Sequence, residues 1–354
     1  MERPRRVLMK RIKLLFASGL EIEFVDRDLG LRRVVEWAEK GVSDVKVVFG
    51  PEGCGKSAWL RQSAEVLREL GFDVIYVDPL MRDFIAYTDL RDFIKRFVDA
   101  ASEILGVASL RLASLAIDFG SHALRAGRKK IAILVDEIFQ AIGLDKAATY
   151  VKSLLNIIEY PPRSYDKMIA IVSTSEGVSR REIGRHRWAE PLPMWNMSEE
   201  GFRQLYNALP DKKLSFNETW RLTGGNPKLL AQLYETNWRV ENIVDSIIER
   251  KRLRTFIASL TQDEKKLLSE ALEDPDKLLE RGREGVELLE KLVELNLVID
   301  IPARKDFLWI DTPPPEQDPE LGIGKHVAWQ TPLHREALKK TLREHITYKF
   351  SSPP

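Results

Sequence analysis

The sequence has little of three things that define whole classes of protein: cysteine, net charge and long hydrophobic runs. Its 354 residues include one cysteine, which excludes a disulfide framework and a cysteine-based zinc site and fits a reducing compartment. With 55 Lys and Arg against 54 Asp and Glu, the formal net charge is +1, so nucleic acid could be bound only by a local patch. The most apolar runs, at 131–135 and 169–172, are strand-length and far below the roughly 20 residues of a membrane helix.

The beginning of the chain imitates a signal peptide. Six Lys and Arg residues lie between positions 3 and 13, and a short apolar stretch follows at 14–19. This stretch is too short for a leader and runs directly into the charged segment 21–28, so we expect a cytoplasmic protein with no membrane partner. A hydrophobic fraction of 44% with 31% charged residues predicts a globular fold, and the length predicts two or three domains.

The first half of the chain alternates strand and helix patterns. The runs at 131–135 and 168–173 are apolar on both faces, which is typical of central strands in a parallel sheet. Between the strands, apolar residues recur at helical spacing, which predicts βαβ units and a doubly wound α/β sheet. The expected strands are 44–49, 72–77, 131–135 and 168–173, and the expected helices are 57–70, 89–105 and 109–126.

The pattern changes to helices alone near residue 193. The expected helices there are 199–209, 215–223, 227–234 and 240–257. A third unit begins near residue 260 with a capping box at Thr261 and Glu264. It continues with a helix at 285–295, hairpin strands at 297–301 and 307–310, and a last helix at 332–345.

Helices followed by a hairpin suggest a winged helix, with the proline-rich segment 313–319 as a long wing loop. The chain is therefore expected to have three domains. They are an α/β core at 1–195, a helical lid at 196–258 and a winged-helix domain at 259–354.

Residues 50–57 form the pattern G-x-x-x-x-G-K-S, which follows an expected strand and opens an expected helix. A phosphate-binding loop requires this setting, because its glycines let backbone N–H groups wrap phosphates and the helix N-terminus adds a favourable dipole. Lys56 is expected to reach the β- and γ-phosphates, and the Ser57 hydroxyl to ligate Mg²⁺. The expected nucleotide contacts are Gly50, Pro51, Glu52, Gly53, Cys54, Gly55, Lys56, Ser57 and Ala58.

Cys54 lies inside this loop, and two interpretations are open. A helix N-terminus lowers the pKa of a thiol, which would suit a redox switch. The simpler interpretation, which we favour, is that the tight turn tolerates a small residue.

Asp136 and Glu137 follow the apolar strand 131–135. Both side chains are therefore expected at the carboxyl edge of the sheet, where ligands bind in such folds. Asp136 is placed to hold Mg²⁺ through its water shell, and Glu137 to polarise the attacking water, as a nucleotide hydrolase requires. Asp78, which ends the strand 72–77, is a rival metal ligand, although Pro79 follows it and no second carboxylate accompanies it.

Hydroxyl groups and arginines follow the next strand. Ser173, Thr174 and Ser175 could bind the γ-phosphate or the attacking water, or could instead form a turn or cap a helix. An arginine near the γ-phosphate would stabilise the charge of the transition state. The candidates in the next segment are Arg180, Arg181, Arg185 and Arg187.

Together these residues resemble the archaeal ATPase family, a branch of the P-loop AAA+/STAND-like NTPases. The loop at 50–57 and residues 134–137 correspond to its Walker A and Walker B motifs, and 173–176 resembles its Ser-x-Ser-Glu. Residues 223–227 (Thr-Gly-Gly-Asn-Pro) resemble the sequence that opens its lid helix. Residues 24–28 look like its N-terminal motif, whose backbone contacts adenine.

The resemblance implies a P-loop fold with a parallel sheet of order 5-1-4-3-2, a helical lid and a C-terminal winged helix, with ATP and Mg²⁺ as ligands. The pair Gly184–Arg185 matches the family's Gly-Arg, so Arg185 joins Lys56 and Glu137 as a catalytic residue. The expected metal ligands are Ser57 and Asp136. The further nucleotide contacts that the resemblance implies are Val25, Arg27, Ser175 and Pro227.

The expected winged helix raises the question of DNA. Such domains often place a helix in the major groove. Here the corresponding helix carries Glu287, Glu290 and Glu294 against Lys291, and an acidic face repels phosphates. A basic cluster at 250–254 keeps DNA as the alternative, but we favour a protein partner that binds the lid or the winged helix. One sequence does not show the oligomeric state.

The sequence therefore predicts an ATP-binding, Mg²⁺-dependent ATPase that acts as a nucleotide-dependent conformational switch. The alternative is a nucleotide-gated DNA-binding or regulatory module with little turnover. Glu137 discriminates between the two, because an intact catalytic glutamate favours hydrolysis, whereas a pure binding module could lose it.

Overall fold

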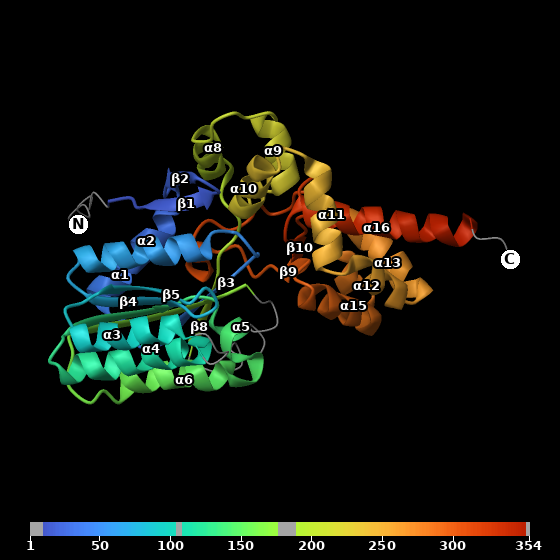
Figure 1. Cartoon of the computed structure of the whole chain (residues 1–354). Helices are drawn as coiled ribbons and strands as arrows, with labels where there is room; N and C mark the ends of the chain where they lie inside the picture. Colours follow the sequence, from blue (N-terminus) through green and yellow to red (C-terminus); the bar gives the residue numbers. More distant parts are fainter. Residues whose placement is uncertain (1–9, 104–107, 176–188, 352–354) are drawn as a thin grey trace.

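The computed structural model describes residues 10–103, 108–175 and 189–351. An α/β core built on a six-stranded sheet lies beside two groups of helices, one above the core and one to its right in Figure 1. In the described part of the chain, no helix is long and apolar enough to cross a membrane.

The core sheet has the strand order β5-β4-β6-β7-β3-β8. Five strands are parallel, and β5 pairs antiparallel with β4 at one edge. Numbered from β3, the parallel strands follow the order 5-1-4-3-2, which confirms the prediction; β5 has no counterpart among the expected strands. The strands are β3 (Val45–Phe49), β4 (Asp73–Asp78), β5 (Asp83–Tyr87), β6 (Lys130–Val135), β7 (Lys167–Thr174) and β8 (Ala189–Pro193).

Alternate side chains of a strand enter two different hydrophobic cores, one on each face of the sheet. In β6, Ile131 and Ile133 pack on the face covered by α3, α4 and α6, while Ala132 and Leu134 pack on the face covered by α1 and α2 (Figure 1). Burial on both faces explains why the strand is a continuous apolar run. The helices of the core are α1 (Asp28–Lys40), α2 (Lys56–Glu69), α3 (Arg91–Ser102), α4 (Ala108–Arg125), α5 (Ile138–Ile142) and α6 (Leu144–Glu159).

The apolar stretch near the N-terminus forms a β-hairpin. β1 (Lys13–Ala17) pairs antiparallel with β2 (Leu20–Glu23), and the chain turns at Gly19, whose φ of 73° suits glycine. Ile22 is buried and packs with the helices that follow the α/β core, whereas Leu15 remains exposed. The hairpin thus bridges the core and the lid helices.

The helices expected between residues 199 and 257 are present, with one difference. The single helix expected at 240–257 is broken in two, because Arg252 adopts a left-handed backbone with φ 51°. The helices are α8 (Glu199–Asn207), α9 (Phe216–Thr223), α10 (Pro227–Glu235), α11 (Val240–Arg250) and α12 (Leu253–Ser259).

The C-terminal region contains the expected helices and a two-stranded sheet, but the expected hairpin is wrong in its second strand. β9 pairs with β10 rather than with residues 307–310. Ile310 is instead buried in a hydrophobic cluster of the α/β core, where its N–H donates to the Pro193 carbonyl at 2.9 Å, and Trp309 is buried in a cluster that joins Phe49 of β3 to C-terminal residues. Their apolar character reflects these contacts. The elements are α13 (Gln262–Glu273), α14 (Lys277–Glu280), α15 (Gly282–Glu294), β9 (Val298–Asp300), β10 (Val327–Trp329) and α16 (Pro332–Ser351).

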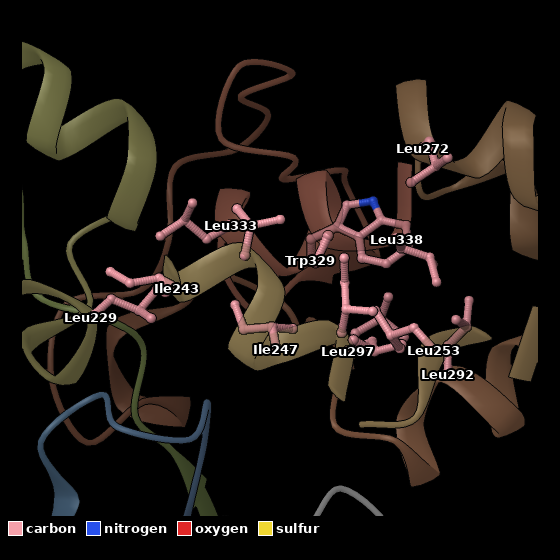
Figure 2. Packing of buried hydrophobic residues seen from close by; sticks show 14 of the residues in the cluster. Leu229, Ile243, Ile247, Leu253, Leu272, Leu292, Leu297, Trp329, Leu333 and Leu338 are labelled. Atoms are coloured by element: carbon pink, nitrogen blue, oxygen red, sulfur yellow. The ribbon is translucent and has the colours of Figure 1, made fainter. Parts of the chain in front are cut away.

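The lid helices and the C-terminal helices share one hydrophobic core. Figure 2 shows Leu229 and Ile243 of the lid lying near Leu333 of α16, with Trp329 and Leu338 farther along the same cluster. The cluster crosses the boundary predicted at 258–259 without interruption. Because buried apolar contact is the main stabilising term in a fold, the two regions are expected to move together more than separately.

Candidate nucleotide-binding site

The loop between β3 and α2 forms a tight cradle. Gly53 and Gly55 have φ values of 77° and 104°, which L side chains rarely adopt, and a Cβ at Gly50 would overlap the Met194 carbonyl. Lys56 opens α2, and its buried ammonium group donates to the carbonyls of Gly50 at 3.0 Å and Pro51 at 3.1 Å. The lysine is thus held inside the loop by two carbonyls that an anion could replace.

The Asp136 side chain is fully buried at the carboxyl edge of β6. One of its oxygens accepts a hydrogen bond from the Tyr76 hydroxyl at 3.0 Å, and the other accepts one from the Ser173 hydroxyl. These two donors come from the neighbouring strands β4 and β7, so the sheet itself fixes the orientation of the carboxylate. Burial and the charge of Asp136 together raise the pKa of Tyr76, which keeps this phenol a donor.

Glu137 follows Asp136 in a left-handed conformation, with φ 43° and ψ 36°, immediately before α5. Its carboxylate accepts hydrogen bonds from the Ser175 backbone N–H at 2.9 Å and from the Ser175 hydroxyl. Its own N–H donates to the Ser173 hydroxyl at 3.3 Å. The structure thus brings Ser173 and Ser175 to the two carboxylates, a partnership that sequence reasoning missed because β6 and β7 are separated by α5 and α6.

Asp78 ends β4 at the same sheet edge and is also buried. Burial, with added repulsion from Asp136 and Glu137, raises its pKa to about 6. One of its oxygens accepts the Met81 N–H at 3.0 Å, so the carboxylate also closes the β4–β5 turn.

Within the described residues, no group of three His, Cys, Asp or Glu side chains is close enough to hold a metal ion alone. Magnesium is usually held by one or two protein oxygens together with phosphates and water. The carboxylate of Asp136 and the hydroxyl of Ser57, at the start of α2, fit such a donor set.

An apolar cavity opens beside the phosphate loop, under the β1–β2 hairpin. It encloses about 550 Å³ together with its open mouth. Six of the expected nucleotide contacts line it, and hairpin and lid side chains that sequence reasoning missed complete the wall. The expected residues are Val25, Arg27, Cys54, Gly55, Ala58 and Pro227, with Phe24 of the N-terminal motif beside them; the added ones include Leu14, Phe16, Met197 and Leu205. An apolar slot of this kind suits the flat ring of a nucleobase.

The Arg27 side chain makes contacts that sequence reasoning did not anticipate. Its guanidinium is buried and pairs with Asp311 at 3.0 Å, while donating to the carbonyls of Cys54 at 2.6 Å and Trp195 at 2.8 Å. Arg27 therefore lines the cavity as a fixed structural group. Asp311 carried no sequence signal, because it lies in the long segment between β9 and β10.

The turn at 223–227 places the lid against the phosphate loop. Pro227 is the first residue of α10, and the Asn226 side chain caps this helix by accepting the Leu229 N–H at 3.1 Å. The same side chain donates to the Glu52 carbonyl at 3.0 Å, and the Lys228 N–H donates to the Gly53 carbonyl at 3.3 Å. The helix turn thus acts both as a cap and as a contact with the loop.

A family model described as an ATPase domain predominantly from Archaea matches residues 24–233. The chain belongs to this family. The matched segment includes the phosphate loop, both carboxylates and the start of the lid, and family membership implies nucleotide binding. No sequence among curated proteins matches the chain.

Several solved structures show a distant likeness to this archaeal ATPase family member. Cdc6p from Pyrobaculum aerophilum is 12% identical with a TM-score of 0.40, the match covering 94% of this chain and 99% of that one. The ADP form of the Aeropyrum pernix ORC2 protein is 15% identical with a TM-score of 0.39, covering 91% and 93%. The ORC1 protein of the same organism, solved with DNA, is 15% identical with a TM-score of 0.38, covering 92% and 94%. Likenesses of this degree do not extend to what those proteins bind.

The expectation for Cys54 came from its place in the loop, and the choice of Arg185 came from the family resemblance. Cys54 is buried and its sulfur lies 3.6 Å from the Met194 carbonyl, which fits a small residue packed in a turn better than a thiol open to oxidants. Arg185, with Arg180, Arg181 and Arg187, lies outside the described residues.

Proposed function

We propose that the protein binds ATP and Mg²⁺ between its α/β core and its lid and hydrolyses the nucleotide. The observation that carries this proposal is the convergence of three features at one sheet edge. The buried ammonium group of Lys56 and the apolar cavity belong to the loop at 50–57, which follows β3, and the carboxylates Asp136 and Glu137 follow β6, separated from β3 by β7 alone in the parallel sheet.

Each group has a specific task in this proposal. The adenine ring would occupy the cavity next to Val25 and Pro227, and Lys56 would exchange its two carbonyl partners for phosphate oxygens. Ser57 and Asp136 would hold magnesium, which supplies charge neutralisation on the β- and γ-phosphates. Other backbone N–H groups of the loop would donate to the phosphates, apart from position 51, where proline has no N–H, and Glu52, whose N–H donates to the Gln330 side chain.

Glu137 would orient the attacking water and accept its proton. The two donors of Ser175 bind different oxygens of this carboxylate, so they orient it while lone pairs remain free for the water. Ser175 therefore acts on catalysis through Glu137 in this proposal. Arg185 is proposed as the arginine that stabilises charge on the γ-phosphate.

Nucleotide state would set the position of the lid and of the C-terminal region. The shared hydrophobic core supports this part of the proposal, because a displaced lid would carry the C-terminal helices with it. A protein partner would then recognise the position of the lid and of the C-terminal region. The basic cluster at 250–254 gives weaker support to DNA, since Arg254 is paired with Glu249 and Glu344.

The experiment is ATP turnover by the wild-type protein and by Glu137→Gln, each with and without DNA. We expect turnover by the wild type, none by the variant, and ATP binding by both. Undiminished hydrolysis by Glu137→Gln would remove Glu137 from the mechanism. Binding without turnover in both proteins would favour a nucleotide-gated module, and stimulation of the wild type by DNA would make DNA the partner.

A further inference from the structure

Glu52, the third residue of the phosphate loop, is bound through every one of its polar groups by other parts of the chain. Its N–H donates to the Gln330 side chain at 3.0 Å, and its carbonyl accepts from the Asn226 side chain at 3.0 Å. One carboxylate oxygen accepts from Lys228 at 2.9 Å, and the other lies 3.7 Å from the ammonium group of Lys251.

These four partners come from three separate segments. Asn226 and Lys228 begin α10, Lys251 follows α11, and Gln330 lies between β10 and α16. No group of Glu52 bonds within its own loop in this set of contacts. Glu52 therefore connects the phosphate loop directly to the lid and to the C-terminal region.

The negative charge of Glu52 is neutralised only when the lid is in place, because both lysines belong to the lid. Burial opposes ionisation of Glu52, but Lys228 and Lys251 outweigh it and lower its pKa to about 2. Lys251 is only 15% exposed and also donates to the Leu295 carbonyl at 2.9 Å, so its ammonium group is fixed in place.

Without the two lysines, a carboxylate at position 52 would disfavour the binding of phosphates to the loop. Like charges repel each other, and the repulsion strengthens where water is excluded. Paired with two lysines, Glu52 presents no net negative charge to the loop. Unpaired, it would oppose an incoming triphosphate.

We propose that Glu52 is a positioning residue that makes ATP binding depend on closure of the lid, because Lys228 and Lys251 must neutralise it before the loop accepts phosphates. This inference rests on the proposed function. The coupling is reciprocal, so bound ATP in turn strengthens the contact between the lid and the loop.

The test is a double-mutant cycle on the affinity for ATP with Mg²⁺, using the wild type, Glu52→Gln, Lys228→Met and the double variant. Lys228→Met leaves the Glu52 charge partly unpaired, so we expect ATP to bind about tenfold more weakly, within the usual range of coupling between sites. Glu52→Gln should bind ATP at least as tightly as the wild type. In the double variant, the loss caused by Lys228→Met should disappear.

Lys340→Met is the matched control, because it removes an ion pair with Asp245 between α11 and α16 that does not touch the loop. Its ATP affinity should equal that of the wild type. Hydrogen exchange gives a second readout: ATP should protect the amides of α10 in the wild type and protect them less in Glu52→Gln. Thermal unfolding confirms that each variant is folded.

Two outcomes would overturn the inference. If Lys228→Met weakens binding equally with and without Glu52, the lysine contacts the nucleotide itself. If Lys228→Met has no effect, the cluster does not influence binding. Failure of the wild type to bind ATP would instead overturn the proposed function, so the two failures are distinguishable.

Discussion

Arg27 and Asp311, which are 284 residues apart in the chain, form a buried ion pair at 3.0 Å, with side-chain exposures of 3% and 4%. Arg27 lies at the start of α1, and Asp311 lies in the long segment between β9 and β10. Because the same guanidinium binds the carbonyls of Cys54 and Trp195, one side chain ties the phosphate loop to the C-terminal region.

Removal of Asp311 should destabilise the protein strongly. Asp311→Ala would leave a buried guanidinium without its counter-ion, at a cost of about 3–5 kcal/mol. The double variant Arg27→Met/Asp311→Leu should lose less than Asp311→Ala, because no buried charge remains. Urea unfolding measures both, with Lys277→Ala at the exposed Lys277–Glu280 pair as a control that should change stability little. A cost for Asp311→Ala no larger than that of the control would contradict a structural role for the pair.

Lys56→Ala should abolish ATP binding while leaving the fold intact. The charge-assisted hydrogen bonds of this lysine to phosphate contribute about 1.5–3 kcal/mol each, so the affinity should fall about 100-fold or more. Titration with a fluorescent ATP analogue gives the affinity, and thermal unfolding checks the fold. A folded variant that binds ATP normally would disprove the assignment of the phosphate loop.

Gly53→Ala should weaken ATP binding by displacing the lid. A Cβ at Gly53 would overlap the Lys228 Cβ and lie 3.0 Å from the Asn226 Oδ1, so α10 would have to move. Gly71→Ala is a matched control, since Gly71 has a similar φ of +80° but has no atom within 4 Å of its added Cβ. Both variants carry the left-handed strain of about 1–2 kcal/mol. Only Gly53→Ala should bind ATP more weakly, and equal affinities would show that the lid tolerates the added methyl group.

Asp78 should make stability depend on pH in the absence of nucleotide and metal. Its folded pKa, about 6, is raised above the unfolded value of 3.8, mainly by burial. The folded state therefore holds the proton more tightly, and this contribution is present below about pH 4 and lost as the pH rises through about 6. Asp78→Asn should remove this loss, so the variant should gain up to about 3 kcal/mol relative to the wild type between pH 4 and 7. If the difference in the free energy of unfolding between the two proteins did not change with pH, the raised pKa of Asp78 would be contradicted.

The sequence predicted the α/β core well because its signals are local. A strand buried on both faces must be a continuous apolar run, as 131–135 is, and glycines that must turn sharply precede Lys56. The strand order came from the family resemblance. β5 was missed because Asp83–Tyr87 is only partly buried at the sheet edge, where apolar alternation is weak.

Contacts between residues that are far apart in the chain left no local signal in the sequence. Glu137 was identified from its place after a strand, but its two hydrogen bonds to Ser175 depend on β6 and β7 being neighbours. Trp309 and Ile310 were assigned to a strand, because a buried apolar pair has the same sequence pattern whether it pairs with a strand or packs on another unit.

The sequence by itself determined which residues are proposed to carry the chemistry, because a phosphate loop and a pair of acids need particular side chains within a few positions of one another. The tertiary structure alone decided what those residues touch. Arg27 meets Asp311, and Glu52 meets Lys228 and Lys251, across distances in the chain over which no local pattern extends. Opposite charges pair wherever folding brings them together out of water, and only the packing of the lid and the C-terminal region on the core brings these charges together.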